Sequence, residues 1–217
     1  MKMLKKAAAV LLAAAMSLTM LTACGGGSGS ASQYKMARIL AESEKTGKLY
    51  IDATIDQLDI GAKVATDKKT GKTIVAVTQD GELADVYMTT ADGTQYEINS
   101  ESKDESDMSS LYWKKTASNP TFGAAMSSVP SSDKVSSMKI VPEYKYGEET
   151  YYAEVLTDGS TEVAYCFKND ALVYIVVKSG NLTIGEKVNA IQANFPDKIA
   201  DVIPVSYDAA MNFKMVG

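Results

Sequence analysis

Residues 138–181 decide the fold, and they read MKIVPEYKYGEETYYAEVLTDGSTEVAYCFKNDALVYIVVKSGN. This stretch contains four segments rich in Val, Ile, Tyr and Phe, at 138–146, 150–156, 161–168 and 171–178. The segments are followed in turn by Gly147-Glu148, Asp158-Gly159, Asn169-Asp170 and Ser179-Gly180-Asn181. Gly, Asn and Asp accept the positive φ angles that tight hairpin turns require. The stretch therefore predicts four antiparallel strands joined by hairpins.

The same pattern occurs in the first half of the chain. Residues 49–55 alternate apolar and polar side chains, which is typical of a strand with one buried face. Segments 73–78, 83–90 and 95–99 follow, and Asp80-Gly81 and Asp92-Gly93 lie between them. A last strand is predicted before Phe195-Pro196, followed by a short irregular segment to Gly217. Thr183 and Glu186 also have the spacing of a helix capping box, so a helix stays open in place of this strand. The total is about nine strands.

Two helical regions accompany these strands. Residues 32–46 place Met36, Ile39 and Leu40 on one helical face, and Gly47 follows where helices commonly end. Residues 119–137 have no alternating pattern and contain Pro120 and Pro130, which predicts a short helical insertion. We therefore expect an α+β fold: a strongly curved antiparallel sheet, or open barrel, with both helical regions on its concave side.

The N-terminal residues specify a location. A basic tip and an apolar run from Ala7 to Leu21 precede Leu21-Thr22-Ala23-Cys24. The run is shorter than the ~20 residues that span a bilayer, and the tetrapeptide resembles the bacterial lipoprotein signal. We expect residues 1–23 to be a cleaved signal peptide, 24–32 to be a lipidated Cys24 with a Gly/Ser tether, and 33–217 to be one domain. The predicted location is the extracytoplasmic face of the cell membrane, reached through a diacylated Cys24.

The charge balance argues against two classes of partner. Removing the first 23 of 217 residues leaves 19 basic and 27 acidic residues, a formal charge of 19 − 27 = −8. Nucleic-acid binding needs clustered Lys and Arg, and the chain has a single arginine, Arg38. Anionic lipid head groups would also be repelled. Contact with the membrane is therefore expected through the acyl chains alone.

Nothing in the sequence indicates catalysis. The chain has no histidine, which excludes Ser-His-Asp and Cys-His arrangements and histidine-bearing metal sites. Once Cys24 is lipidated, Cys166 is the only thiol left, and it lies in the apolar segment 163–167. We expect it to be buried and inert. The sequence predicts no enzyme activity, no metal site and no cofactor.

The order of elements behind the lipoprotein signal resembles the LolA-like superfamily of open-barrel lipoprotein carriers and mycobacterial lipid-binding lipoproteins. The short sequence motifs that carry this resemblance are Glu143-Tyr144 with residues 147–151, residues 165–167 followed by 169–172, Phe195-Pro196, and residues 203–207. In such carriers an arginine lies inside the barrel. Here Arg38 falls in the predicted helix, so a lipoprotein cargo in particular is not favoured.

The resemblance implies binding of an acyl chain or another amphiphile between the curved sheet and its helices. Candidate residues lining such a pocket are apolar or aromatic: Met36, Leu40, Ile51, Met88, Tyr96, Trp113, Met126, Tyr165 and Phe167. The same residues would also suit an ordinary packed β core. The alternative function is therefore a cell-envelope interaction module with a closed core and an unidentified protein partner.

Overall fold

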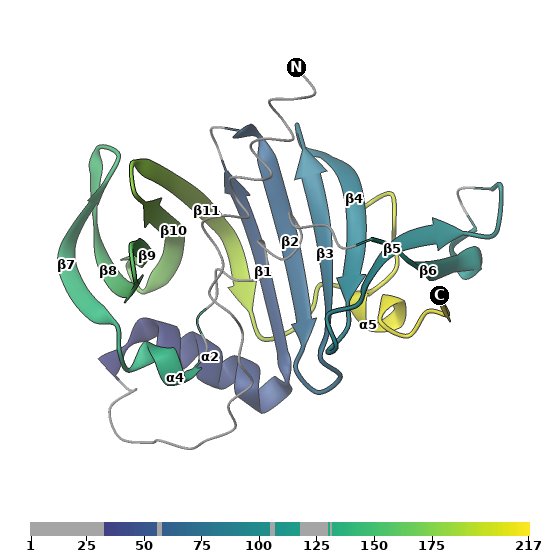
Figure 1. Cartoon of the computed structure of the whole chain (residues 1–217), viewed down its shortest axis with the longest axis horizontal. Coiled ribbons are helices and arrows are strands. Elements are labelled where there is room, and N and C mark those ends of the chain that lie inside the picture. The colour runs from purple at the N-terminus through teal and green to yellow at the C-terminus, as the bar shows by residue number, and fades with distance from the viewer. Residues whose placement is uncertain (1–32, 56–57, 105–106, 118–129, 131) are drawn as a thin grey trace.

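The chain folds around one sheet of twelve strands, which is not closed (Figure 1). This computed structural model describes residues 33–55, 58–104, 107–117, 130 and 132–217. The fold is α+β and dominated by the sheet, as expected. The signal peptide, Cys24 with its tether, Met126, and residues 119–129 and 131 of the predicted helical insertion lie outside the described residues.

The sheet consists of two meanders that meet at its centre. The first meander follows chain order through β1 (Lys48–Ile55), β2 (Ile60–Asp67), β3 (Lys72–Gln79), β4 (Glu82–Thr89), β5 (Gln95–Ser100) and β6 (Leu111–Lys115). The second follows it through β7 (Lys139–Tyr146), β8 (Glu149–Asp158), β9 (Thr161–Lys168), β10 (Ala171–Ser179) and β11 (Leu182–Gln192). Antiparallel pairing of β1 with β11 joins the two meanders.

The prediction of about nine strands, all antiparallel, was wrong in two respects: the sheet has twelve strands, and one pair of them is parallel. Three strands escaped the prediction of nine: β2, β6 and β12 (Met215–Val216). The sheet is mixed because β12 pairs in parallel with β6. Strand β2 was missed because its sequence, IGAKVATD, contains three small residues, Gly61, Ala62 and Ala65, and no aromatic one, although Ala65 is fully buried. The segment before Phe195-Pro196, where a helix had stayed open, is the predicted strand, β11 (Leu182–Gln192).

The hairpin turns confirm the local pattern. Asp80 and Gly81 have φ angles of 53° and 81°, and Asn169 and Asp170 have 50° and 67°. Two consecutive positive φ angles match the right-handed twist of the flanking strands, as in type I′ turns. Short-range turn chemistry therefore fixes the order of neighbouring strands.

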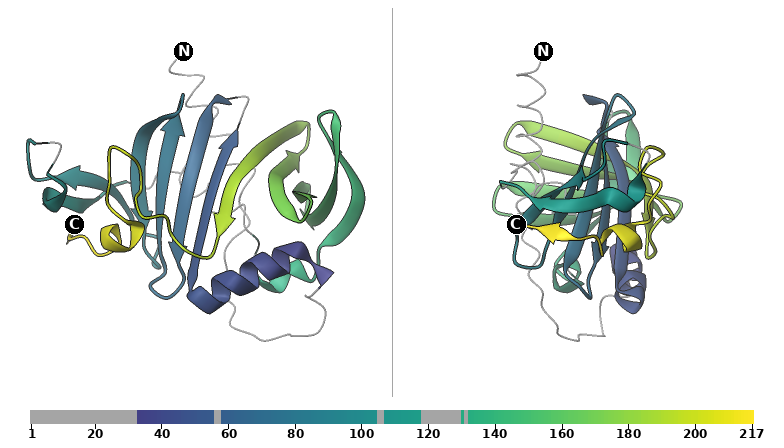
Figure 2. Two further views of the ribbon diagram at one scale, coloured as in Figure 1. Left: turned by 180° about the vertical axis from the view of Figure 1, so that it is seen from behind. Right: turned by 90° about the vertical axis from the view of Figure 1, so that its right-hand side faces the viewer.

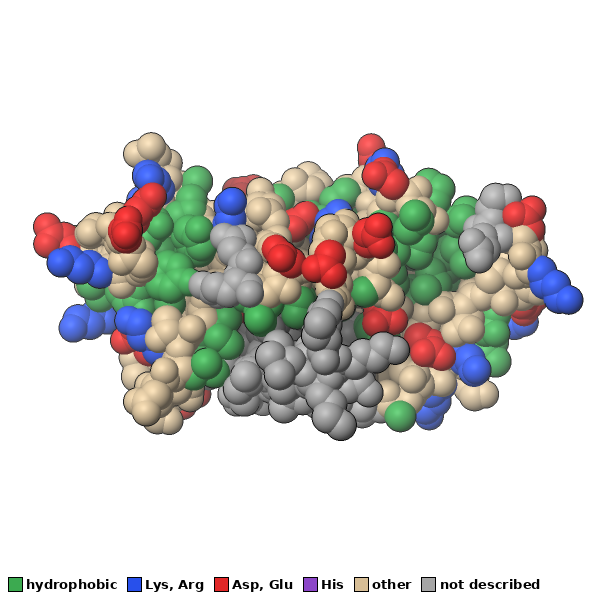
Figure 3. Space-filling model, turned by 90° about the horizontal axis from the view of Figure 1, so that it is seen from above, with side chains coloured by type: hydrophobic (Ala, Val, Ile, Leu, Met, Phe, Trp, Pro, Cys, Tyr) green, Lys and Arg blue, Asp and Glu red, His purple; other side chains and the backbone are tan. Residues whose placement is uncertain are grey.

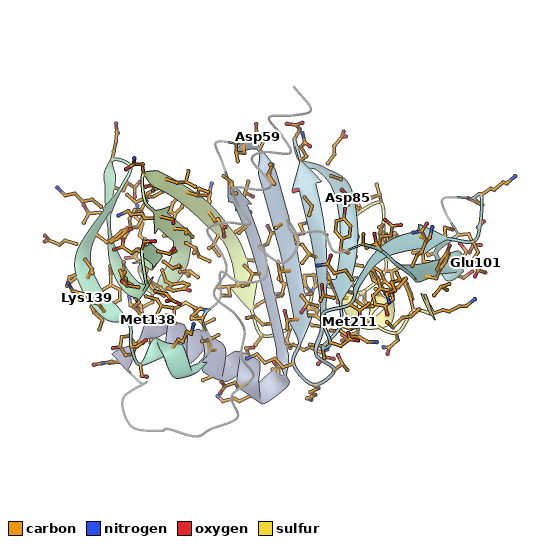
Figure 4. All side chains as sticks on the ribbon, viewed as in Figure 1. Asp59, Asp85, Glu101, Met138, Lys139 and Met211 are labelled. Carbon is orange, nitrogen blue, oxygen red and sulfur yellow. The ribbon has the colours of Figure 1, made fainter. Side chains whose placement is uncertain are left out.

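Helix α2 (Lys35–Thr46) ends at Gly47, as predicted, with a left-handed φ of 76°. It covers one face of β1 and β8–β11, together with the short helix α4 (Ser132–Val135). The buried residues of this contact, which we call the α2 core, are Tyr34, Met36, Leu40, Leu49, Ile51, Ile55, Val135, Met138, Leu156, Val163, Tyr165, Phe167, Leu172, Ile175, Val177 and Ile184. Met138 lies where α4 leads into β7 (Figure 4).

Residues 193–217 cover the opposite face of the first meander, as Figure 2 shows from behind. We call this segment the C-terminal cover. It contains α5 (Tyr207–Ala210) and β12, although the sequence predicted only a short irregular tail. The cover core consists of Tyr50, Ala65, Ile74, Ala76, Val86, Met88, Trp113, Ile199, Tyr207, Ala210 and Met211. The apolar residues of this segment occur in short groups with no helical or strand period, so the sequence pattern did not predict α5 or β12.

The second meander curls strongly toward the face opposite to α2, so that this face is concave. The hydroxyl of Tyr146, on edge strand β7, lies so close to Gly185 on β11 that an added Cβ atom would be 1.9 Å from it. Three strands separate β7 from β11 in the sheet. The ring of Tyr174 bridges this curl, with centroids 5.4 Å from Tyr146 and 5.9 Å from Tyr151. We call this surface the tyrosine face.

Cys166 lies on the tyrosine face within β9 and is fully buried, which confirms the prediction of a buried thiol. Burial raises the pKa of its thiol to about 12. Because only the thiolate reacts, a maleimide should leave Cys166 unmodified in the native domain and label it fully in denaturant. Cys166→Ala should cost only about 1 kcal/mol, measured by urea unfolding. Rapid labelling of the native domain would contradict this placement.

Candidate functional site

The sheet divides the candidate pocket residues between its two faces. Met36, Leu40, Ile51, Tyr165 and Phe167 come together in the α2 core. Met88 and Trp113 belong to the cover core on the other face, and Tyr96 packs against them. The α2 core is thus the part of the chain where a majority of the candidates meet. No single pocket lined by all the described candidates can exist, because the sheet itself lies between the two groups.

A row of side chains that runs across the second meander distinguishes the α2 core from an ordinary apolar interior. Glu154 on β8 is opposite Tyr165 on β9, Tyr165 is opposite Ile175 on β10, and Ile175 is opposite Glu186 on β11. Glu154 is fully buried and Glu186 is 6% exposed. Both carboxyl groups therefore lie on the face that packs against α2, with strands β9 and β10 between them.

Sequence reasoning missed both glutamates, although a signal was present. Glu186 lies between Ile184 and Val188, so the period of two assigns it to the same face as these two apolar residues. A charged residue on the inward face of a strand breaks the alternating pattern, and such a break indicates a structural or functional need.

Glu154 has a structural role at the start of α2. Its carboxyl oxygens accept hydrogen bonds from the backbone N–H groups of Lys35 and Met36, the latter at 2.9 Å. Tyr34 at the N-cap makes no side-chain capping bond of its own. A residue 119 positions further along the chain therefore supplies the cap. The positive end of the helix dipole also favours a carboxylate there.

Glu186 has no such explanation. No described residue forms a hydrogen bond or ion pair with it, although its carboxyl oxygens are not among the fully enclosed side-chain atoms that lack a partner. Burial raises the pKa of its carboxyl group from the ordinary 4.5 to about 7. Burial also raises the pKa of Tyr165, and the nearby Glu186 raises it further. A buried carboxyl group without a partner costs free energy whenever it ionises.

This environment predicts a pH-dependent stability. The folded state resists ionisation of Glu186, so the full stability is present below pH 4.5 and is lost as the pH rises through about 7. The loss amounts to about 3 kcal/mol above pH 8. Glu186→Gln should therefore raise the free energy of unfolding by about 3 kcal/mol at pH 8 and by almost nothing at pH 4, measured by urea titration. The exposed Glu148→Gln is the control, and an equal gain in both variants would contradict the burial of Glu186.

The outer side of α2 carries mixed charges next to this interior. The Lys35 ammonium lies 2.6 Å from a carboxylate oxygen of Asp170. It also lies over the rings of Tyr152 and Phe167, at 4.6 Å and 5.4 Å from their centroids. A shallow hollow at the same place is lined by Lys35, Arg38, Ile39, Glu42 and Asp170. The basic groups at this end of α2 are therefore at the surface and already face an acidic partner.

Neither a metal-binding cluster nor a membrane-crossing helix occurs in the described ranges. No three His, Cys, Asp or Glu side chains there are grouped so that they could hold a metal ion. None of the described helices has both the length and the apolar character needed to cross a membrane.

Comparisons with known proteins place the chain in no family. No protein-family model matches it, and no curated protein matches it either. Among solved structures, it is similar to that of an uncharacterized conserved protein from Thermus thermophilus. The two share 11% identity with a TM-score of 0.39, and the match covers 84% of this chain and 99% of the other.

Proposed function

We propose that the protein is a membrane-anchored bacterial lipoprotein whose domain binds a lipid or another amphiphile between α2 and the sheet. It would serve as a carrier or chaperone and not as an enzyme. The α2 core supports this proposal most strongly, because it gathers five of the candidate pocket residues around buried carboxyl groups in an apolar layer. The LolA-like open, curved sheet is part of the same proposal, but the predicted helix position is wrong for the second meander: it curls away from α2, which therefore lies on its convex side.

The way α2 is attached is consistent with an interior that can open. Its N-terminus is held by Glu154, and Tyr34 just before it donates a hydrogen bond to the backbone oxygen of Met138 at 2.9 Å. Between these polar anchors and Gly47 the contact is apolar side-chain packing through residues such as Met36 and Leu40. Such packing is non-directional, so an acyl chain can replace the helix side chains without leaving polar groups unpaired. The hydrophobic side chains that gather over the β7–β11 half in Figure 3 lie at the end of the molecule away from α2, because that view is from above and α2 runs along the bottom of Figure 1.

Fluorescence quenching can locate the ligand on one face of the sheet. Phe167→Trp in a Trp113→Phe background places the only tryptophan in the α2 core, whereas native Trp113 lies in the cover core. A neutral monoacylglycerol with a brominated chain should quench the Phe167→Trp fluorescence and leave the native protein's fluorescence unchanged. Equal quenching of both proteins, or of neither, would contradict binding in the α2 core.

The tight packing of the α2 core favours a second candidate function. Met36 is fully buried, and Val135, Tyr165 and Ile175 are each 1% exposed, so the centre of this core is closed to solvent. The domain would then be a cell-envelope interaction module with a closed core and a protein partner. In that case neither tryptophan would be quenched, and the amphiphile would not raise the melting temperature.

The anchor is tested separately from the ligand. Because diacylation of Cys24 supplies two acyl chains, Cys24→Ser should move the protein from the detergent phase to the aqueous phase on phase partitioning. Cys166→Ser is the matched control and should not change the partitioning. A Cys24→Ser variant that partitions like the unaltered protein would show that the apolar N-terminal run, and not a lipidated cysteine, is the anchor.

A further inference from the structure

The polar groups inside the α2 core are acidic, and this selects a class of ligand. No lysine or arginine is among the buried residues of the α2 core within the described part of the chain, whereas Glu154 and Glu186 are buried on the same face. We propose that the amphiphile carries a primary amine or another N–H cation as its head group and that Glu186 binds it. This inference rests on the proposed function and names the ligand class that the same site would take.

The two glutamates are not equivalent in this proposal. Glu154 already accepts two backbone N–H groups of α2, so its hydrogen-bonding capacity serves the helix. Glu186 retains its full capacity, because no described residue donates to it, and it lies between Ile184 and Val188. An ammonium group would satisfy this carboxylate by charge and by N–H donation, while the attached chain contacts the apolar neighbours.

An anionic head group does not suit the same place. A fatty-acid carboxylate brought into the α2 core would approach two buried carboxyl groups in a medium where like charges repel strongly. The N-terminal end of α2 carries Lys35, but this ammonium is paired with Asp170 at the surface. The charge pattern therefore discriminates between amphiphiles of equal chain length.

Among the described residues, the titratable groups that face Glu186 can be enumerated from each packed element. Strand β8 contributes Glu154 and strand β9 contributes Tyr165, while β10 presents Ile175. The residues of β1 and α4 in this core are apolar: Leu49, Ile51, Ile55 and Val135. The inward residues of α2 are Met36, Leu40 and Ser43, and none of them ionises near neutral pH. Ionisation of Glu186 should thus dominate any pH dependence of binding between about pH 5.5 and 8.5.

The test compares three ligands with the same ten-carbon chain: decylammonium, decanol and decanoate. Calorimetric titration of the full chain carrying Cys24→Ser is done at pH 5.5 and pH 8.5. Decylammonium stays charged at both pH values, so its affinity should rise at least about tenfold at the higher pH, where Glu186 is ionised. Decanol should bind equally at both, and decanoate should bind about tenfold more weakly than decanol.

Glu186→Gln supplies the decisive variant. It should remove the pH dependence for decylammonium and leave the affinity for decanol unchanged, while the exposed Glu148→Gln behaves like the unaltered protein. Decanol binding with no preference for decylammonium over decanoate would overturn the amine proposal and leave the proposed function standing. Absence of binding by all three ligands would overturn both.

Discussion

Glu154→Ala is expected to lower the free energy of unfolding by about 3–5 kcal/mol, because it leaves the part-buried N–H of Lys35 and the buried N–H of Met36 without acceptors at the start of α2. Each unsatisfied buried donor costs about 1–3 kcal/mol, and the lost side-chain volume adds a cavity. Urea unfolding measures the loss. Hydrogen exchange should show that the α2 amides lose protection before those of β8–β11.

The control for this prediction is Glu148→Ala, an exposed glutamate in the turn that precedes the same strand. It should change the free energy of unfolding by less than about 0.5 kcal/mol. Glu154→Gln retains one acceptor oxygen and should fall between the two. Unchanged exchange of the α2 amides in Glu154→Ala would show that β8 does not hold the helix.

Trp113→Ala should be comparably costly on the other face of the sheet. Trp113 is fully buried in the cover core, and its indole N–H donates to the backbone oxygen of Ala210 at 2.7 Å. Removing a buried tryptophan side chain typically costs about 3–5 kcal/mol. Limited proteolysis should then cut the C-terminal cover, which is also held by Lys72 through the backbone oxygen of Met211 at 2.6 Å.

Trp113→Phe separates packing from hydrogen bonding. Phenylalanine keeps most of the apolar contact with Tyr207 and Met211 but loses the bond to Ala210, which should cost about 1–2 kcal/mol. If Trp113→Phe were as unstable as Trp113→Ala, the hydrogen bond to Ala210, and not the apolar packing, would be the main contribution of Trp113 to stability. Resistance of Trp113→Ala to proteolysis would instead show that the cover stays attached without the tryptophan.

The local part of the fold could be predicted from the sequence because hairpins are encoded by neighbouring residues. The Asn169-Asp170 and Asp80-Gly81 turns fix which strands are adjacent, and Gly47 fixes the end of α2. The pairing of β1 with β11 could not be predicted in the same way, since its partners lie far apart in the chain, for example Ile51 with Ile191. The parallel contact of β12 with Trp113 is equally non-local.

The candidate site was predicted only in part for a related reason. Apolar periodicity identified Met36 and Leu40 as inward-facing, but periodicity along one segment does not tell which face of the sheet a distant strand shares. Met88 and Trp113 therefore entered the same list although they lie under the C-terminal cover. The buried row that ends in Glu186 becomes visible only when the strand register is known.

Native mass spectrometry tests ligand binding in the α2 core most directly. The full chain carrying Cys24→Ser, purified without detergent, should show a second species heavier by the mass of one amphiphile, and the released ligand should ionise as an amine. Phe167→Glu would place a further carboxylate in the α2 core and should abolish this species, whereas Glu148→Gln at the surface should keep it. A single clean mass, unchanged after incubation with decanol or decylammonium, would contradict a ligand between α2 and the sheet.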